Sequence, residues 1–250
     1  MDVKGKGVLI VGSKRIGSVI AKYLSTQGMC VAIGYRNSIS EAESLQQEID
    51  NSNGKVVLIK GDILIEEDIK QMLKISKEKL GDLTFMINLA SDFPLTPFNE
   101  LNEESWEKSM GIAKGNYLLN LHASKIFFGN PGPVAGHIIQ FSDWAAGETP
   151  YKDYLPYLTS KAAIDFMTRC FAVELAEYSI LVNTIAPGPT MRPPEISTDV
   201  WEREVLSKTP LNRESSAQDI AEIILALLRS ETITGETIRI DAGRHLLGSG

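Results

Sequence analysis

A tyrosine and a lysine stand four residues apart in the stretch YLTSK, at Tyr157 and Lys161. If this stretch is helical, the two side chains lie on one face, because positions i and i+4 face the same way. A phenol with an ordinary pKa of about 10 exchanges protons poorly at neutral pH, but a neighbouring ammonium favours the phenolate and lowers that pKa. The pair indicates a tyrosine general acid, although the same spacing is typical of an ordinary exposed helix start.

Two glycines in LIVGSKRIGSVIA, Gly12 and Gly17, separate an apolar run from a helical pattern. Backbone amides and a helix N-terminus at such a position can receive a pyrophosphate. Two glycines are also what a tight turn requires, so the strand before them and the helix after them carry much of the argument. The pattern predicts a dinucleotide site at this loop.

The end of the second apolar run indicates which dinucleotide is bound. A site for NAD normally places Asp or Glu there to accept from the ribose hydroxyl, whereas a 2′-phosphate needs cations. The chain reads IGYRNS, with Arg36 and no acid, and Lys14 and Arg15 stand in the glycine loop. We therefore expect NADP(H), the alternative being that Arg36 is an ordinary surface residue. Asp62 could meet the adenine amino group, or it could cap a helix.

Composition restricts the classes of partner. Of the 250 residues, 43% are hydrophobic and 23% charged, and the formal charge of -7 argues against nucleic acid or an anionic membrane as the main partner. The apolar run before Gly12 is too short for a signal sequence or a membrane span, so we expect a cytoplasmic protein. Cys30 and Cys170 lie in apolar runs and are expected to be buried thiols. The three histidines, His122, His137 and His245, are not spaced as metal ligands, and no metal is expected.

Short apolar runs alternate with longer helical patterns along the chain, which is typical of a parallel sheet with crossover helices. The expected strands cover residues 7–12, 30–35, 55–60, 84–90, 136–142, 180–186 and 237–242. The expected helices include 16–28, 39–54, 66–81 and 218–230. The pattern predicts a single α/β domain over residues 1–250, a Rossmann-type doubly wound parallel sheet of about seven strands.

Three long segments follow expected strand ends, at about 91–105, 143–156 and 188–215. Open parallel sheets bind ligands at the carboxyl ends of their strands, and long loops there are usually functional. We expect these segments to surround a small-molecule substrate. Phe93, Trp144, Tyr151 and Tyr154 fall in the first two segments and could stack on a flat ring or simply pack the lid.

Further motifs occur in a fixed order: NLAS from Asn88, GHIIQFSD from Gly136, NTIAPGPT from Asn183 and ITGETIRIDAG from Ile233. With the glycine loop and YLTSK, they resemble the short-chain dehydrogenase/reductase family over essentially the whole chain. The resemblance implies that Tyr157 exchanges the carbonyl proton, that Lys161 lowers its pKa and holds the nicotinamide ribose, and that the cofactor supplies hydride. The cofactor contacts it implies are Gly12, Ser13, Lys14, Arg15, Ile16, Gly17, Arg36, Asp62, Ile63, Asn88, Ala90, Tyr157, Lys161, Pro187, Gly188 and Thr190.

The family position that usually holds a substrate-binding serine is occupied by Asp143, with Ser142 one place before it. Strand side chains alternate faces, so the two cannot both face the substrate from a regular strand. With Arg15, YRNS and ASDFPLTPFNE, the aspartate resembles the pteridine reductase branch, where a carboxylate suits the N–H-rich edge of a pterin. Alternatively, Ser142 takes the role through a bulge and the substrate is a ketone or a 3-oxoacyl thioester.

Several positions depart from the family pattern. Val11 replaces a threonine, the glycine spacing is one residue shorter, and the segment from Asp143 to Tyr157 is one residue longer. Ala113 stands where an active-site asparagine is usual, and Asn116 lies three residues further on, facing a similar direction. These departures motivate an alternative in which the chain binds nucleotides without turnover.

The pattern after Tyr157 is more apolar than a solvent-facing helix needs. As in the family, this indicates a homodimer or homotetramer. The apolar positions are Ile164, Met167, Phe171 and Leu175.

Overall fold

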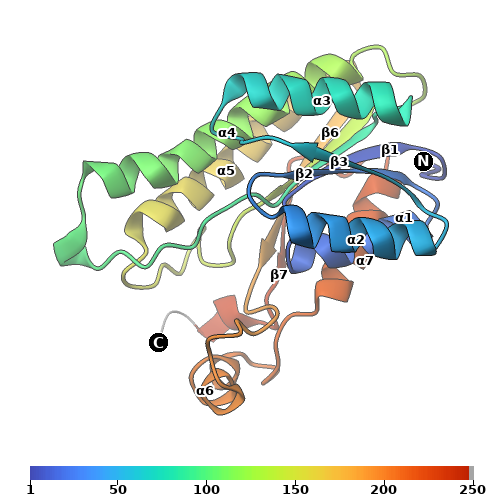
Figure 1. The fold of residues 1–250 in the computed structure, drawn as a ribbon. Coiled ribbons are helices and arrows are strands. Elements are labelled where there is room, and N and C mark those ends of the chain that lie inside the picture. Colours follow the sequence, from blue (N-terminus) through green and yellow to red (C-terminus); the bar gives the residue numbers. More distant parts are fainter. Residues whose placement is uncertain (248–250) are drawn as a thin grey trace.

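Seven parallel strands form one sheet in the order β3-β2-β1-β4-β5-β6-β7. This computed structural model describes residues 1–247 (Figure 1). Every predicted strand is confirmed, with ends that differ by at most two residues. The strands are β1 (Gly7–Val11), β2 (Cys30–Tyr35), β3 (Lys55–Lys60), β4 (Phe85–Asn88), β5 (Gly136–Phe141), β6 (Ile180–Pro187) and β7 (Thr237–Ile240).

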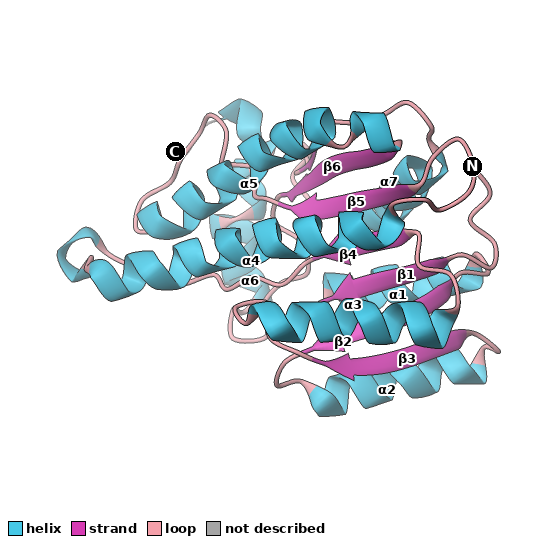
Figure 2. Ribbon diagram, turned by 90° about the horizontal axis from the view of Figure 1, so that it is seen from above, coloured by secondary structure: helices cyan, strands magenta, loops and turns pink. Residues whose placement is uncertain are grey.

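Helices cover both faces of the sheet, as expected for crossover connections between parallel strands (Figure 2). One face carries α1 (Ile16–Thr26), α2 (Ile39–Asn51) and α7 (Ala217–Arg229), and the other carries α3 (Glu66–Leu80), α4 (Glu103–Phe127) and α5 (Leu155–Glu174). The short α6 (Thr198–Glu204) lies apart from both layers, below the sheet in Figure 1. The arrangement is the predicted Rossmann-type doubly wound fold.

The strands form because their sequences are continuous apolar runs, which suits a sheet covered on both sides. All five residues of β1 are buried. Two hydrophobic clusters result, one on each face of the sheet. Consecutive β1 residues point to opposite faces, so Leu9 packs in one cluster and Ile10 in the other. Burial on both faces holds the register of the central strands and thereby the positions of their carboxyl ends.

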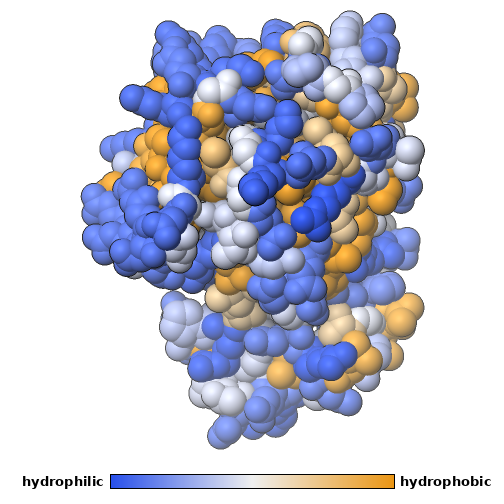
Figure 3. Space-filling model, turned by 90° about the vertical axis from the view of Figure 1, so that its right-hand side faces the viewer, coloured by the Kyte–Doolittle hydropathy of each residue, from blue (hydrophilic) through white to orange (hydrophobic). Residues whose placement is uncertain are grey.

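The chain reverses its strand order between β1 and β4, and ligands bind at such a point in open α/β sheets. The glycine loop after β1 and the segments after β4, β5 and β6 all lie at this edge. The opposite end of the molecule, seen in Figure 3, shows hydrophilic residues interrupted by smaller hydrophobic areas. The site is therefore expected at the carboxyl edge.

The predicted segment 188–215 is not a simple loop, because it contains α6 and a 3-10 turn, Leu206–Lys208. A bridge between Thr190 and Ser215 closes its two ends. Ser197 caps α6 by accepting from the Val200 amide at 3.4 Å. The segment therefore leaves the sheet after β6 and returns to it next to the point where it left.

The prediction of two buried thiols is wrong for Cys170, which is exposed, while Cys30 is half-buried. Cys170 stands on the outer side of α5, away from the sheet, and the apolar run around it did not show which side faces inward. Within residues 1–247, no helix is both long and apolar enough to cross a membrane.

His137 is fully buried on β5, and neither of its ring nitrogens has a hydrogen-bond partner among the described residues. Burial lowers its pKa to about 4, and the nearby N-terminal ammonium adds to that effect. The Ser230 backbone opposes this lowering of the His137 pKa, although it makes no hydrogen bond to the ring. The folded protein therefore favours the neutral imidazole.

This burial predicts an acid-sensitive contribution to stability. The unfolded chain binds a proton at His137 below about pH 6.5, whereas the folded chain does not bind one until near pH 4. The free energy of unfolding therefore decreases as the pH is lowered from about 6.5 to about 4. His137→Leu should remove roughly 2–3 kcal/mol of the decrease in unfolding free energy between these pH values. Urea denaturation at several pH values measures this change. His122→Leu, whose imidazole contacts Glu66, is the control. An unchanged pH slope in His137→Leu would contradict the prediction.

Candidate active site

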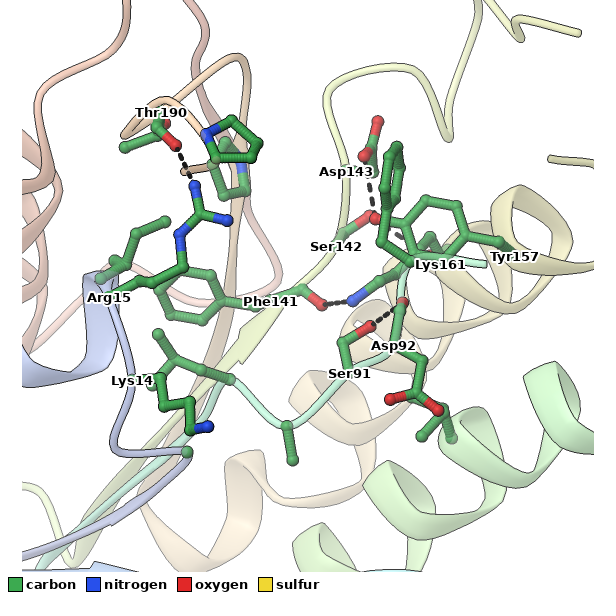
Figure 4. A pocket seen from close by; sticks show the side chains of 18 of the residues that line it. Lys14, Arg15, Ser91, Asp92, Phe141, Ser142, Asp143, Tyr157, Lys161 and Thr190 are labelled. Atoms are coloured by element: carbon green, nitrogen blue, oxygen red, sulfur yellow. Dashed lines mark hydrogen bonds between the residues drawn. The ribbon is translucent and has the colours of Figure 1, made fainter. Parts of the chain in front are cut away.

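A cavity of about 920 Å³ opens at the carboxyl edge of the sheet. Figure 4 shows its two sides, with Lys14 and Arg15 of the glycine loop facing Asp143, Tyr157 and Lys161. The three segments predicted to surround the substrate all contribute lining residues. Of the expected cofactor contacts, Gly17 and Asn88 lie behind the lining, and the rest border the cavity.

Tyr157 and Lys161 stand in α5 and are both buried, as their helical spacing predicts. Tyr157 Oη donates to Asp143 Oδ2 at 2.9 Å. Lys161 Nζ donates to the Phe141 carbonyl oxygen at 2.9 Å and lies 5.6 Å from the centroid of the Tyr157 ring. The end of β5 thus holds both side chains of the pair.

The pKa of Tyr157 is raised well above its ordinary value, mainly by burial and then by the charge of Asp143. This direction is opposite to the one expected from a neighbouring ammonium. Burial lowers the pKa of Lys161 to about 8, although Asp143 opposes that shift. Burial also raises the pKa of Asp143. Burial and the Asp143 carboxylate, neither of which the Tyr–Lys spacing includes, therefore decide the direction of the Tyr157 pKa shift.

Asp143 and Ser142 point to different places, as strand alternation predicts. The Asp143 carboxylate faces Tyr157, while Ser142 Oγ donates to the Lys161 carbonyl oxygen at 3.3 Å. The ladder continues past β5, because the Ser142 amide donates to the Ile185 carbonyl at 2.9 Å. Ser142 reaches no phenol from this position, and the bulge that would turn it toward Tyr157 is not formed.

The shortened glycine loop folds back tightly onto its own start. Gly12 has a φ of 106°, and a Cβ at Gly17 would lie 2.0 Å from the Gly12 carbonyl oxygen. Only glycine fits at these two positions. Arg15 has a φ of 52°, and its guanidinium donates to the carbonyls of Thr190, at 3.1 Å, and Met191. The side chain therefore ties the loop to the segment after β6, a contact that the sequence did not indicate.

Two of the three cations predicted to face a phosphate, Lys14 and Arg36, are paired with an acid. Lys14 Nζ lies 2.5 Å from Glu41 Oε1, and Arg36 lies 3.5 Å from Asp62 Oδ2. Asp62 Oδ1 also accepts from the Leu64 amide at 3.0 Å, but the N-cap of α3 is Ile65 and no side chain caps that helix, so the predicted helix cap is wrong. Glu41 lies in the first turn of α2, and the sequence analysis did not identify it.

Asn116 is a buried contact between α4 and the sheet. It accepts from Asn88 Nδ2 at 2.8 Å, and its own Nδ2 donates to the Ile112 carbonyl at 2.9 Å. Asn88 Oδ1 accepts from the Ala90 amide at 3.1 Å. Asn116 thereby fixes the turn after β4 and does not border the cavity, and neither does Ala113.

Aromatic rings cover the end of the cavity beyond Tyr157. Phe93 stacks on Tyr154 with ring centroids 4.4 Å apart and meets the edge of Tyr157 at 5.0 Å. Trp144 stacks on Tyr151 at 5.8 Å. The Arg244 guanidinium, another lining group that the sequence analysis missed, lies 5.1 Å from the Trp144 ring. No local motif marks Arg244, because the fold alone brings the C-terminal segment to this site.

A family model described as enoyl-(acyl carrier protein) reductase matches residues 11–245. The chain belongs to the short-chain dehydrogenase/reductase family. Glucose 1-dehydrogenase 2 of Bacillus subtilis is 28% identical over 99% of this chain and 98% of its own. An uncharacterized oxidoreductase of Thermotoga maritima is 32% identical over 97% of this chain and 98% of its own. The family consists of nicotinamide-dependent oxidoreductases.

A solved structure of FolM alternative dihydrofolate reductase 1 from Brucella canis, complexed with NADP, superimposes with a TM-score of 0.88. It is 28% identical and covers 98% of this chain and 96% of its own. This short-chain dehydrogenase/reductase therefore shares its architecture with a protein that holds a nicotinamide dinucleotide.

The role of Asn116 can be tested against Asn120, one turn later in α4. Asn120 is equally buried, but neither of its amide atoms has a partner among the described residues. Asn116→Ala leaves the Asn88 amide unpaired, so it should cost about 1–3 kcal/mol more stability than Asn120→Ala. Urea denaturation of the two variants measures the difference. Equal losses would contradict the assigned role of Asn116.

Proposed function

We propose that the chain is an NADPH-dependent reductase that transfers hydride to a C=O or C=N group of a small substrate, with a pterin-like substrate slightly favoured. The observation that carries the proposal is the hydrogen bond between Tyr157 and Asp143 beside the Lys161 ammonium. It stands at one end of a cavity whose other end holds the glycine loop and two cations. A proton donor and a dinucleotide-sized space are thus joined in one cavity.

The residues present fit a nicotinamide dinucleotide with a 2′-phosphate. Gly12 and Gly17 lack side chains where the glycine loop packs closely against neighbouring backbone. The loop leads into the N-terminus of α1, where a diphosphate is favoured. Lys14 and Arg36 would receive the 2′-phosphate by exchanging their present acidic partners for it. The NADP bound to the Brucella relative supports this choice.

The bound nicotinamide would supply hydride to the substrate. Tyr157 would give its phenolic proton to the oxygen or nitrogen that receives the new electron pair. The proton of Tyr157 would then be restored from solvent, because the Asp143 carboxylate accepts hydrogen bonds and carries no proton to give. Lys161, fixed by the Phe141 carbonyl, would orient the ribose and offset the negative charge left beside it.

Asp143 is the reason for favouring a pterin-like ring. Its carboxylate accepts N–H donors, which a pterin edge provides and a simple ketone lacks. Phe93 is 59% exposed beside Tyr157 and offers a face on which a flat ring can stack. The second candidate is a ketone or 3-oxoacyl thioester reductase; the description of the matching family model names an acyl carrier protein but an enoyl C=C, so it supports the acyl carrier and not the 3-oxo group. That candidate would use Tyr157 in the same way without a substrate bond to Asp143.

A nucleotide-binding protein without turnover is the third candidate. The shortened glycine loop and Ala113 motivate it. The closely spaced Tyr157, Lys161 and Asp143 argue against it, because burying three titratable groups together is costly unless they serve a purpose.

A homodimer or homotetramer is also proposed. The outer sides of α4 and α5 carry exposed apolar residues, which favours their burial against a second copy. The exposed residues include Tyr117, Phe166 and Val173, whose exposed fractions are 45%, 61% and 77%.

A cytoplasmic location remains a prediction from the sequence.

Removing the Tyr157 hydroxyl tests the proposed acid. Tyr157→Phe should lower kcat about 100-fold to 10,000-fold, because general acid catalysis contributes that much. The affinity for NADPH should stay within about threefold, since the lost hydroxyl bonds to Asp143 and is not a main cofactor contact. Steady-state rates and calorimetric titration give the two quantities. Unchanged turnover would exclude Tyr157 as the acid and with it the proposed function.

Reversing one charge and removing another tests the 2′-phosphate site. Arg36→Glu should weaken NADPH binding about 10-fold to 100-fold and leave NADH nearly unchanged. Glu41→Gln should tighten NADPH about twofold to fivefold, because Lys14 loses a competing partner. Paired titrations with NADPH and NADH measure both effects, and Glu43→Gln, an exposed position two residues further along α2, is the control. Equal changes for both dinucleotides would place the 2′-phosphate elsewhere.

A further inference from the structure

The Asp143 carboxylate is almost fully engaged in hydrogen bonds. Oδ1 accepts from the Ala145 amide at 2.9 Å. Oδ2 accepts from two phenols, Tyr157 at 2.9 Å and Tyr151 at 3.3 Å. A carboxylate oxygen has about two acceptor positions, so both positions on Oδ2 are taken. An N–H donor of a substrate can reach Oδ2 only if one phenol gives up its place.

The two phenols differ in how firmly they are held. Tyr157 lies inside α5, and its bond to Oδ2 has the shorter length. Tyr151 stands in the irregular segment between β5 and α5, and its bond is longer than a usual O–H···O contact. Tyr157 is also fixed by the backbone of its helix, whereas Tyr151 stands outside every helix and strand. Tyr151 is therefore the phenol that can leave.

We propose that Tyr151 occupies, in the free protein, the position on Asp143 that an N–H donor of the substrate takes in the complex. The inference rests on the proposed function, because it assigns Asp143 to the substrate. It makes Tyr151 a specificity-determining residue. A ligand with N–H donors recovers a hydrogen bond on displacing the phenol, whereas a ligand without them recovers none and therefore leaves Tyr151 on Oδ2.

The neighbourhood of Tyr151 allows this displacement. Its ring lines the cavity and stacks on Trp144, which follows Asp143 in the chain. Tyr154 lies in the same aromatic group, with its ring centroid 5.1 Å from that of Tyr151. Tyr154 makes no contact with Asp143 in the described hydrogen bonds, which makes it a matched control for the loss of a phenolic hydroxyl.

The test compares Tyr151→Phe, Tyr154→Phe and the wild type, each saturated with NADP. Calorimetry measures Kd for 2,4-diaminopteridine, whose edge carries N–H donors, and for a bicyclic aromatic ketone that has none. Tyr151→Phe should bind the diaminopteridine about threefold to tenfold more tightly, because the ligand no longer displaces a hydrogen bond. Its Kd for the ketone should not fall, and Tyr154→Phe should match the wild type for both ligands.

Three outcomes would overturn the inference. Weaker or unchanged binding of the diaminopteridine by Tyr151→Phe would mean that the phenol does not stand in the ligand's place. A parallel gain for the ketone would mean that the substitution only enlarges the cavity. Absence of diaminopteridine binding in the wild type and in Tyr151→Phe would mean that Oδ2 does not accept the N–H donor of the ligand. Ketone reduction that depends on Tyr157, found alongside any of these, would leave the reductase function standing while this inference fails.

Discussion

The hydrogen bond from Tyr157 to Asp143 joins the first turns of α5 to the chain that follows β5. Both side chains are buried, so water competes little for the bond and an unpaired partner would be costly. The bond from Lys161 to the Phe141 carbonyl fixes the same helix to the same strand. The other parts of the cavity are arranged around these two bonds.

Because of this arrangement, the titrating groups act as one coupled set. A tyrosine beside a lysine alone would have its pKa lowered, but the carboxylate of Asp143 and the low polarity of the site raise it. Loss of the Tyr157 proton would place a phenolate beside the Asp143 carboxylate, and burial and charge both oppose it.

Much of the fold could be predicted because the central strands are buried apolar runs and the crossover helices between them show a helical apolar period. The division between Ser142 and Asp143 could also be predicted, because alternation along a strand is a local property. The α6 helix was missed because it lies within a proline-rich segment that reads as a loop. Cys170 was misplaced because an apolar helical run does not say which side meets the sheet.

The sequence by itself determined the parallel sheet, the glycine loop and the spacing of Tyr157 and Lys161, because these depend on residues near one another in the chain. Only the tertiary structure decided that Asp143 meets both Tyr157 and Tyr151, that Glu41 pairs with Lys14, and that Arg244 borders the cavity. These contacts join segments that are separate in the sequence. Their electrostatic effect depends on distance and burial, which the packing of whole helices and loops fixes.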